Sequence, residues 1–340
     1  MAYTTIKKPT DYFNTKLYTG NGSTNAITGV GFQPDLTWIK IRNAAGESHS
    51  WWDAVRTATK YISSNNNNAE ATDSTGLTAF DSDGFTLGST GRVNQNTNTF
   101  ASWNWKAGTT TGIGGSPSIT PLGYSFNATS GFSAIKYEGT GSAGTLPHGL
   151  GVAPSMIIVK ALETTDNWAV YHKSLGATKY IELNLTAAAG TSAVMWNDTE
   201  PTSTLFTVNT NGGVNTAGND YIAYCFAEKT GYSKFGSWIS NNNADGTFVY
   251  TGFAPSFVML KEDDGTNQWV MYDNKRPGYN KTPNALFANA TSAEATDLGV
   301  DLLSNGYKIR STNNQNTGNY IYMAFGQSLV GTNNIPATAR

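Results

Sequence analysis

An acid–base pair with a spacing of three residues occurs twice in the sequence. Asp53 precedes Arg56, and Asp273 precedes Arg276. A carboxylate and a guanidinium can pair through two parallel hydrogen bonds, either to hold a polar ligand or to fix a loop against a sheet. A third, related segment has His172 where the other two have Asp. A pair that occurs in two copies and is replaced by other residues in the third is typical of residues that support the fold. The pattern therefore favours the structural role of fixing a loop against a sheet.

The residues that could hold a metal ion are few and scattered. Residues 81–84 (Asp-Ser-Asp-Gly) resemble the start of a calcium loop but lack its later ligands and its closing Glu, so we expect a turn. His49, His148 and His172 show no zinc-binding spacing. Cys225 lies in an apolar, strand-like segment, where a buried and unreactive thiol is expected. The sequence therefore predicts neither a metal site nor a cofactor.

Tryptophans are the candidate contacts for a ligand. Trp103 and Trp105 alternate, which places both on one face of a strand, and core packing is the commoner reason for such a pair. Trp51, Trp196 and Trp238 are placed less regularly. We expect these three to be exposed and name them as candidate binding residues.

No catalytic motif stands out. The sequence has no G-x-S-x-G elbow and no Walker loop. A carboxylate pair for glycoside hydrolysis is defined by its separation in space, which the sequence does not display. A catalytic pair should appear as a distinctive feature of one copy of the repeat described below, and no copy has such a feature. We therefore predict that the protein is not an enzyme, with a carbohydrate-binding or carbohydrate-active protein as an alternative.

Composition excludes several other classes of protein. The 340 residues carry 22 Lys and Arg against 24 Asp and Glu, so a net charge of −2 gives no basic footprint for nucleic acid. No apolar run reaches the ~18 residues of a membrane span, and the first residues lack the apolar core of a secretory signal. A single Cys cannot form an internal disulfide. With 12% aromatic residues and abundant Gly, the chain reads as a β-rich, weakly charged protein.

The elements that must position these residues are repeated three times. Each copy has a glycine, three positions before a proline, that leads into a short apolar run ending in Lys: residues 31–40 (GFQPDLTWIK), 151–160 (GVAPSMIIVK) and 252–261 (GFAPSFVMLK). Each copy also closes on an aromatic strand: residues 100–105 (FASWNW), 221–226 (YIAYCF) and 320–325 (YIYMAF). The short apolar runs are typical of strands buried on both faces.

The second copy is the most diverged. It has His172 and Leu175 where the other copies have Asp and Arg, and it departs from them again across residues 197–203. These departures mark either a specialised face or simple drift. His172 is therefore the fourth candidate binding residue.

Frequent turn signals between short strands predict an all-β protein made of three tandem antiparallel β-sandwich, jelly-roll-like domains. We expect most aromatic side chains to form three small cores, one in each repeat. The Gly/Ser/Thr-rich segment between the first two repeats predicts a flexible linker. The expected boundaries are an N-terminal arm (1–11), repeat 1 (12–106), the linker (107–122), repeat 2 (123–229), repeat 3 (230–328) and a C-terminal tail (329–340).

The repeat resembles the β-rich repeat domain of virion structural proteins from tailed phages, especially phages of marine bacteria and cyanobacteria. Residues 18–24, 31–35, 67–72 and 80–87 carry the resemblance, which covers about residues 12–328. It implies a tail fibre, a receptor-binding protein or another exposed virion component. It supplies no catalytic or ligand-binding residues.

The resulting expectation is a non-enzymatic phage structural protein on the particle surface, made in the host cytoplasm. The first interpretation is a tail fibre or receptor-binding component, and the alternative is a capsid decoration or head-fibre protein. Expected partners are other virion proteins, further copies of the chain (a trimer being one arrangement) and a host surface glycan or protein. Neither nucleic acid nor membrane insertion is expected.

Overall fold

A computed structural model describes residues 4–276, 280, 284–296, 299–312 and 317–328. Within these ranges nearly all of the regular secondary structure is β-strand, and every strand pair that we assign is antiparallel, for example β1 with β9. The predicted all-β, antiparallel sandwich class is therefore confirmed. The predicted tail, 329–340, lies outside the described residues.

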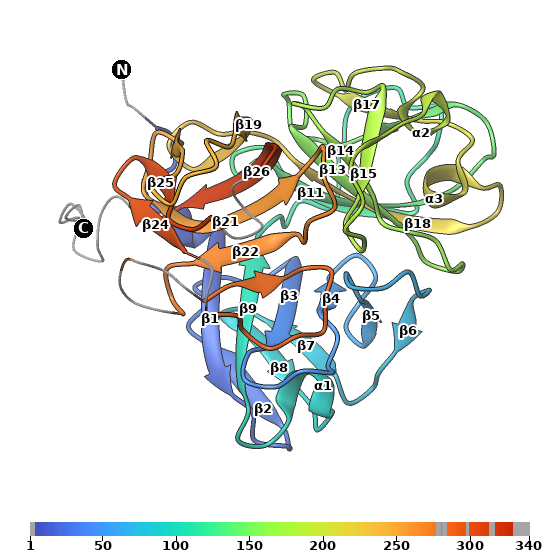
Figure 1. Cartoon of the computed structure of the whole chain (residues 1–340). Helices are drawn as coiled ribbons and strands as arrows, with labels where there is room; N and C mark the ends of the chain where they lie inside the picture. Colours follow the sequence, from blue (N-terminus) through green and yellow to red (C-terminus); the bar gives the residue numbers. More distant parts are fainter. Residues whose placement is uncertain (1–3, 277–279, 281–283, 297–298, 313–316, 329–340) are drawn as a thin grey trace.

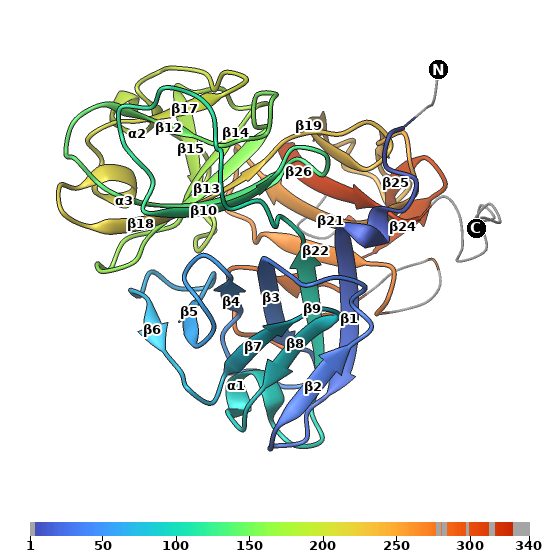
Figure 2. The same cartoon turned by 180° about the vertical axis from the view of Figure 1, so that it is seen from behind.

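A common order of five adjoining strands occurs in three segments, which we call the first unit (12–106), the second unit (123–229) and the third unit (230–328). Each unit has one main sheet and one small sheet (Figures 1 and 2). The main sheets have the orders β1-β9-β3-β4-β5-β6, β10-β11-β18-β13-β14-β15-β16 and β19-β26-β21-β22-β23. The small sheets have the orders β2-β8-β7, β12-β17 and β20-β25-β24.

The elements of each unit have the following bounds. A 3₁₀ turn η1 (Pro9–Asp11) precedes the first unit, which contains β1 (Phe13–Thr19), β2 (Asn25–Thr28), β3 (Leu36–Ile41), β4 (Ser50–Asp53), β5 (Lys60–Ile62), β6 (Ala71–Thr72), β7 (Leu77–Asp81), β8 (Gly84–Leu87), α1 (Gly91–Asn94) and β9 (Thr99–Trp105). The second unit contains β10 (Gly123–Asn127), β11 (Phe132–Glu138), β12 (Gly144–Pro147), β13 (Met156–Ala161), β14 (Ala169–His172), β15 (Lys179–Glu182), β16 (Gly190–Thr191), α2 (Ala193–Trp196), β17 (Leu205–Val208), α3 (Gly212–Asn215) and β18 (Asp220–Phe226). The third unit contains β19 (Ser233–Ile239), β20 (Phe248–Tyr250), β21 (Pro255–Glu262), β22 (Val270–Asp273), β23 (Leu286–Phe287), β24 (Val300–Leu303), β25 (Gly306–Ile309) and β26 (Asn319–Gly326).

Each main sheet is buried on both faces. One face packs against its own small sheet and forms a core that belongs to that unit. The opposite face, which we call the inner face, packs against the inner faces of the other two main sheets in one shared core. Figure 1 shows the three units as three lobes that meet at this core. The central strands β3, β13 and β21 are accordingly buried at almost every position, as the short apolar runs predicted.

Three rings at equivalent positions meet in the shared core. Trp105, Phe226 and Phe325 each pair with the start of the central strand, opposite Leu36, Met156 and Phe257. Their ring centroids lie 6.0 Å (Trp105–Phe226), 5.8 Å (Trp105–Phe325) and 6.3 Å (Phe226–Phe325) apart. The inner faces therefore converge with approximate threefold symmetry.

This arrangement corrects two expectations. The aromatic residues do not form three separate cores, because the largest cluster is common to all three units. The segment 107–122 is not a free linker: the Ala107 N–H donates to the Asp35 carboxylate over 2.7 Å, and Ile119 is buried in the core of the second unit. Its Gly, Ser and Thr residues form turns on that unit's surface, and its isoleucines anchor it.

Gly84 shows why the hairpin signal in residues 81–84 was reliable. Asp81 pairs with Gly84, so a two-residue turn joins β7 to β8. Gly84 has φ 146°, and a Cβ there would lie 1.9 Å from the Ile27 carbonyl oxygen. Only glycine fits this approach of backbone to backbone. Asp83 accepts hydrogen bonds from the backbone N–H groups of Gly29 and Gly31, which joins this turn to the segment that follows β2.

The three α-helices among the described residues have four residues each, and none is long or apolar enough to cross a membrane.

A shared core predicts that the three units unfold together. We expect one cooperative transition in urea, with Phe325→Ala lowering the free energy of unfolding by about 3–5 kcal/mol because it empties the centre of the shared core. Phe80→Ala, at a half-buried position of the first unit, serves as the control with a smaller loss. Tryptophan fluorescence and far-UV circular dichroism measure the transition. Two or more separated transitions in the wild-type chain would contradict the shared core.

Candidate functional site

Hydrogen bonds join the units head to tail around the shared core. We name the contacts the first–second, second–third and third–first interfaces. At each one a backbone N–H of one unit donates over 2.8 Å to a carbonyl of the next: Glu70 to Leu162, Ala189 to Asp263, and Glu294 to Arg42. Because the third unit contacts the first in the same way as the first contacts the second, the three units form a closed ring.

The predicted Asp–Arg pairs lie at these interfaces. At the first–second interface the Arg56 Nε donates to Asp53 Oδ2 over 2.5 Å, and its Nη1 donates to Glu70 Oε2 over 3.0 Å. The hydroxyl of Tyr224, from the second unit, donates to the same Asp53 oxygen over 2.6 Å. The Asp53 and Arg56 side chains are at most 1% exposed. The scaffold interpretation of the pair fits this geometry, since every group is held by protein.

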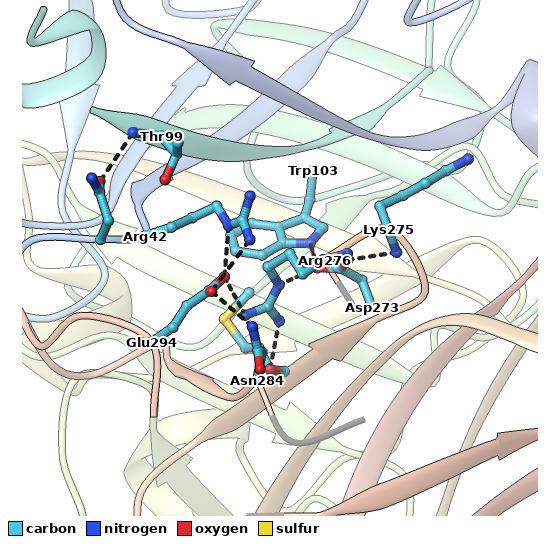
Figure 3. A network of polar contacts seen from close by, with 10 residues as sticks. Arg42, Thr99, Trp103, Asp273, Lys275, Arg276, Asn284 and Glu294 are labelled. Atoms are coloured by element: carbon cyan, nitrogen blue, oxygen red, sulfur yellow. Dashed lines mark hydrogen bonds and ion pairs between the residues drawn. The ribbon is translucent and has the colours of Figure 1, made fainter. Parts of the chain in front are cut away.

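The third–first interface repeats this cluster (Figure 3). Arg276 donates to Asp273 over 2.7 Å and to Glu294 over 3.3 Å, while the indole N–H of Trp103 donates to Asp273 over 3.1 Å. Arg42 of the first unit adds a second guanidinium, 2.7 Å from Glu294. An Asp, an Arg and a Glu therefore recur as one set, with a donor from the neighbouring unit.

The second–third interface replaces the whole set with neutral groups. His172, Leu175 and Ala189 occupy the positions of Asp, Arg and Glu, and Leu175 and Ala189 pack against the shared core. The His172 Nε2 lies 3.1 Å from the backbone carbonyl of Tyr322 in the third unit. Replacing all three members together avoids an unpaired buried charge.

Each central strand ends in a buried lysine whose ammonium is held by carbonyl groups. Lys40 donates to Thr291 over 3.2 Å and Lys261 donates to Thr186 over 3.1 Å, both across an interface, whereas Lys160 bonds within its own unit. Burial lowers the pKa of each of the three lysines to about 8, so they remain charged at neutral pH. The repeated Lys therefore joins neighbouring units at the third–first and second–third interfaces and stays within its own unit in the second copy.

The candidate binding residues named from the sequence are all buried. Trp51 lies in the shared core, Trp196 in the core of the second unit and Trp238 in that of the third, with 1%, 2% and 7% of their surface exposed. His172 is fully buried. The expectation of exposed contacts is therefore wrong for the three tryptophans. Trp51 looked irregular because Val170 and Met271 occupy its position in the other units, where they face the same shared core.

Cys225 is buried in β18, and burial raises the pKa of its thiol to about 12, as expected for an unreactive side chain. Within the described ranges, no group of three or more His, Cys, Asp or Glu residues has the geometry to hold a metal ion.

Sequence reasoning missed two buried asparagines that shape exposed loops. Asn94 accepts a hydrogen bond from the Asn21 N–H and donates to the Ser23 carbonyl. Asn215 does the same for the loop at Thr140 and Ser142. The signal was present as a Val-Asn pair that ends both α1 and α3. These asparagines hold the loops at the outer end of two units in fixed conformations.

A groove of about 460 Å³ lies where the first unit meets the connecting segment and β10. The residues that line it include Gln33, Asp35, Val55, Thr110, Tyr124 and Ser125. Asp35 Oδ1 accepts a hydrogen bond from the Ser125 hydroxyl over 2.6 Å, and burial raises the pKa of the Asp35 carboxyl. Serines, Ser155 and Ser256, occupy this position in the other units. The groove offers hydroxyl, amide and carboxylate groups beside one aromatic ring.

Comparison with known proteins gives one match. A family profile described as a domain of unknown function, DUF7483, matches residues 8–328. The chain belongs to the DUF7483 family. The match spans all three units and the connecting segment. No curated protein matches the chain significantly, and neither does any solved structure.

The neutral residues at the second–third interface predict how substitutions in the Asp–Arg–Glu cluster change the stability of this DUF7483 chain. Arg56→Leu alone should lower the free energy of unfolding by about 3–5 kcal/mol, because it leaves buried carboxylates unpaired. The triple variant Asp53→His/Arg56→Leu/Glu70→Ala copies the second unit and should recover most of that loss. Urea denaturation measures both. The scaffold interpretation fails if the triple variant is less stable than Arg56→Leu.

Proposed function

We propose that this chain is a non-enzymatic structural protein of a phage virion, exposed on the particle as a tail fibre or receptor-binding component. The observation that supports it most is the closed ring: three sandwich units share one core and hold their outer loops on a rigid frame. Rigid frames that carry polar loops are a common design of recognition proteins. The sequence resemblance to virion proteins supports the same proposal.

The exposed loops fit contact with a neutral surface. The residues concerned are 21–24, 95–97, 140–143, 216–218 and 241–245, of which Asp245 alone is charged. Hydrogen bonding by Asn, Thr, Ser and backbone groups depends little on ionic strength, whereas contacts between charges are screened within about 3–10 Å in salt water. The loops therefore suit a glycan or a weakly charged protein as the partner.

The ring also bears on how copies would associate. A repeat of this kind could pair with two others in a trimer, but here those faces are already covered within one chain. Assembly with other virion proteins or with further copies then uses the outer surface. A capsid decoration or head-fibre protein has the same requirement, so location on the particle separates the two interpretations.

Cryo-electron microscopy of intact particles, with antibody-gold labelling of this chain, tests the proposal. We expect density at the tail that the three-lobed ring fits. Density on the capsid alone would support the decoration protein instead. Absence of the chain from purified particles would reject both virion roles.

The groove at Asp35 favours a second candidate function, carbohydrate binding. A partly exposed aromatic side chain, here Tyr124, beside hydroxyl, amide and carboxylate groups is the usual chemistry of a sugar site. The volume of 460 Å³ falls in the range of ligand pockets.

Saturation-transfer NMR with neutral oligosaccharides from the host surface tests this candidate. We expect a signal that Tyr124→Ala reduces at least tenfold and that Leu122→Ala leaves unchanged, since Leu122 is 56% exposed nearby but does not line the groove. Equal signals in both variants would exclude the groove. Release of new reducing ends would instead indicate an enzyme.

A further inference from the structure

The three histidines have the same hydrogen-bonding pattern but different places in the ring. Each is fully buried. In each, Nδ1 accepts a hydrogen bond from a group close in sequence, namely Trp38 Nε1–H for His49, the Leu150 N–H for His148 and the Ser174 N–H for His172. An accepting Nδ1 assigns the neutral ring with its proton on Nε2. Adding a second proton would place an N–H against an N–H in all three cases.

His172 lies at the second–third interface. Its Nε2 donates over 3.1 Å to the Tyr322 carbonyl of β26, in the third unit. The ring of Phe235, also from the third unit, lies 6.5 Å away. The charged neighbour is Lys173, and no carboxylate among the described residues contributes to the pKa of His172. Burial lowers that pKa to about 4.

His49 lies at the third–first interface. Its Nε2 lies beside the Phe287 carbonyl of β23 in the third unit, without a hydrogen bond of normal geometry. The cations near it are Lys40, from its own unit, and Arg276, from the third. Burial holds the pKa of His49 well below its usual value, and the two cations lower it further.

The remaining interface and the remaining histidine complete the pattern. The first–second interface holds Asp53, Arg56, Glu70 and Tyr224 and contains none of the three histidines. His148 lies inside the second unit, where its Nε2 is 3.2 Å from the Thr202 carbonyl. Burial lowers the pKa of His148 to about 4 as well. Both histidines that face another unit therefore face the third.

We propose that acid opens the ring at the two interfaces of the third unit, while the first–second interface stays closed. A protonated His49 or His172 regains water only if the third unit moves away. At neutral pH the shared core makes the three units unfold together, but the third unit also has a core of its own between its main and small sheets. When acid breaks both of its interfaces, this second core lets the third unit separate while its strands stay folded. In this proposal the hinge is the short connection around Gly231, between β18 of the second unit and β19 of the third.

The direction with pH follows from linkage. A histidine whose pKa is about 4 when closed and about 6.5 when open binds more protons in the open state between these values. Acidification from pH 6.5 therefore favours opening. At pH 4, His172 alone raises the opening constant about 10²-fold.

Small-angle X-ray scattering of the full chain between pH 7.5 and 4 tests the proposal. We expect a reversible rise in the radius of gyration below pH 6.5, with the far-UV circular dichroism unchanged. The pH dependence of the opening constant should correspond to the uptake of about two protons. His49→Gln/His172→Gln should show no expansion above pH 4, and each single variant should retain a one-proton steepness. His148→Gln, with the same buried geometry away from the interfaces, should behave as wild type.

Three results would overturn the proposal: a constant radius of the wild-type chain down to pH 4, an expansion that His148→Gln shifts as far as the interface variants, or an expansion accompanied by loss of circular dichroism. If a variant fails to fold, NMR of the three histidine rings in the wild-type chain replaces it. The rings of His49 and His172 should then titrate with the expansion, and that of His148 should not. Titration of all three together would indicate general unfolding.

Discussion

The burial of the inner faces of the three main sheets is the constraint on which the rest of this structure depends. Each inner face carries large apolar side chains, such as Trp38, Met156 and Phe257. A unit alone would leave this face in water, at a cost of roughly 25 cal/mol for each square ångström of apolar surface. The chain has a single cysteine and so no internal disulfide to offset that cost. Closing three units around one core removes all three faces from water at once.

Closing the ring also buries polar backbone and charged groups, which must then be paired. The N–H groups of Glu70, Ala189 and Glu294 find their partners in the neighbouring unit. The Asp–Arg–Glu cluster is present or absent as a whole: Asp, Arg and Glu occur together at two interfaces, and all three are absent at the third. The co-replacement follows from the high cost of an unpaired buried charge. The polar contacts thus fix the register of units that apolar burial holds together.

Local features of the fold were predictable from sequence, because they depend on neighbouring residues. The buried central strands, the turn at Gly84 and the buried thiol of Cys225 are examples. What covers a strand was not predictable. An apolar run shows that both faces are buried but not by what, so Trp51 was assigned to the surface although it lies in the shared core. The segment 107–122 was read from its Gly and Ser content, while the burial of Ile119 depends on residues far along the chain.

Amide hydrogen exchange at neutral pH tests the closed ring most directly. The amides of Glu70, Ala189 and Glu294 lie outside the assigned strands, yet each donates to a carbonyl of another unit. If the ring is closed, these three amides exchange only as fast as the strand amides of the shared core, because the same opening must expose both. Exchange of the three amides at the rate of exposed amides without a hydrogen bond, with the strands still protected, would contradict the closed ring.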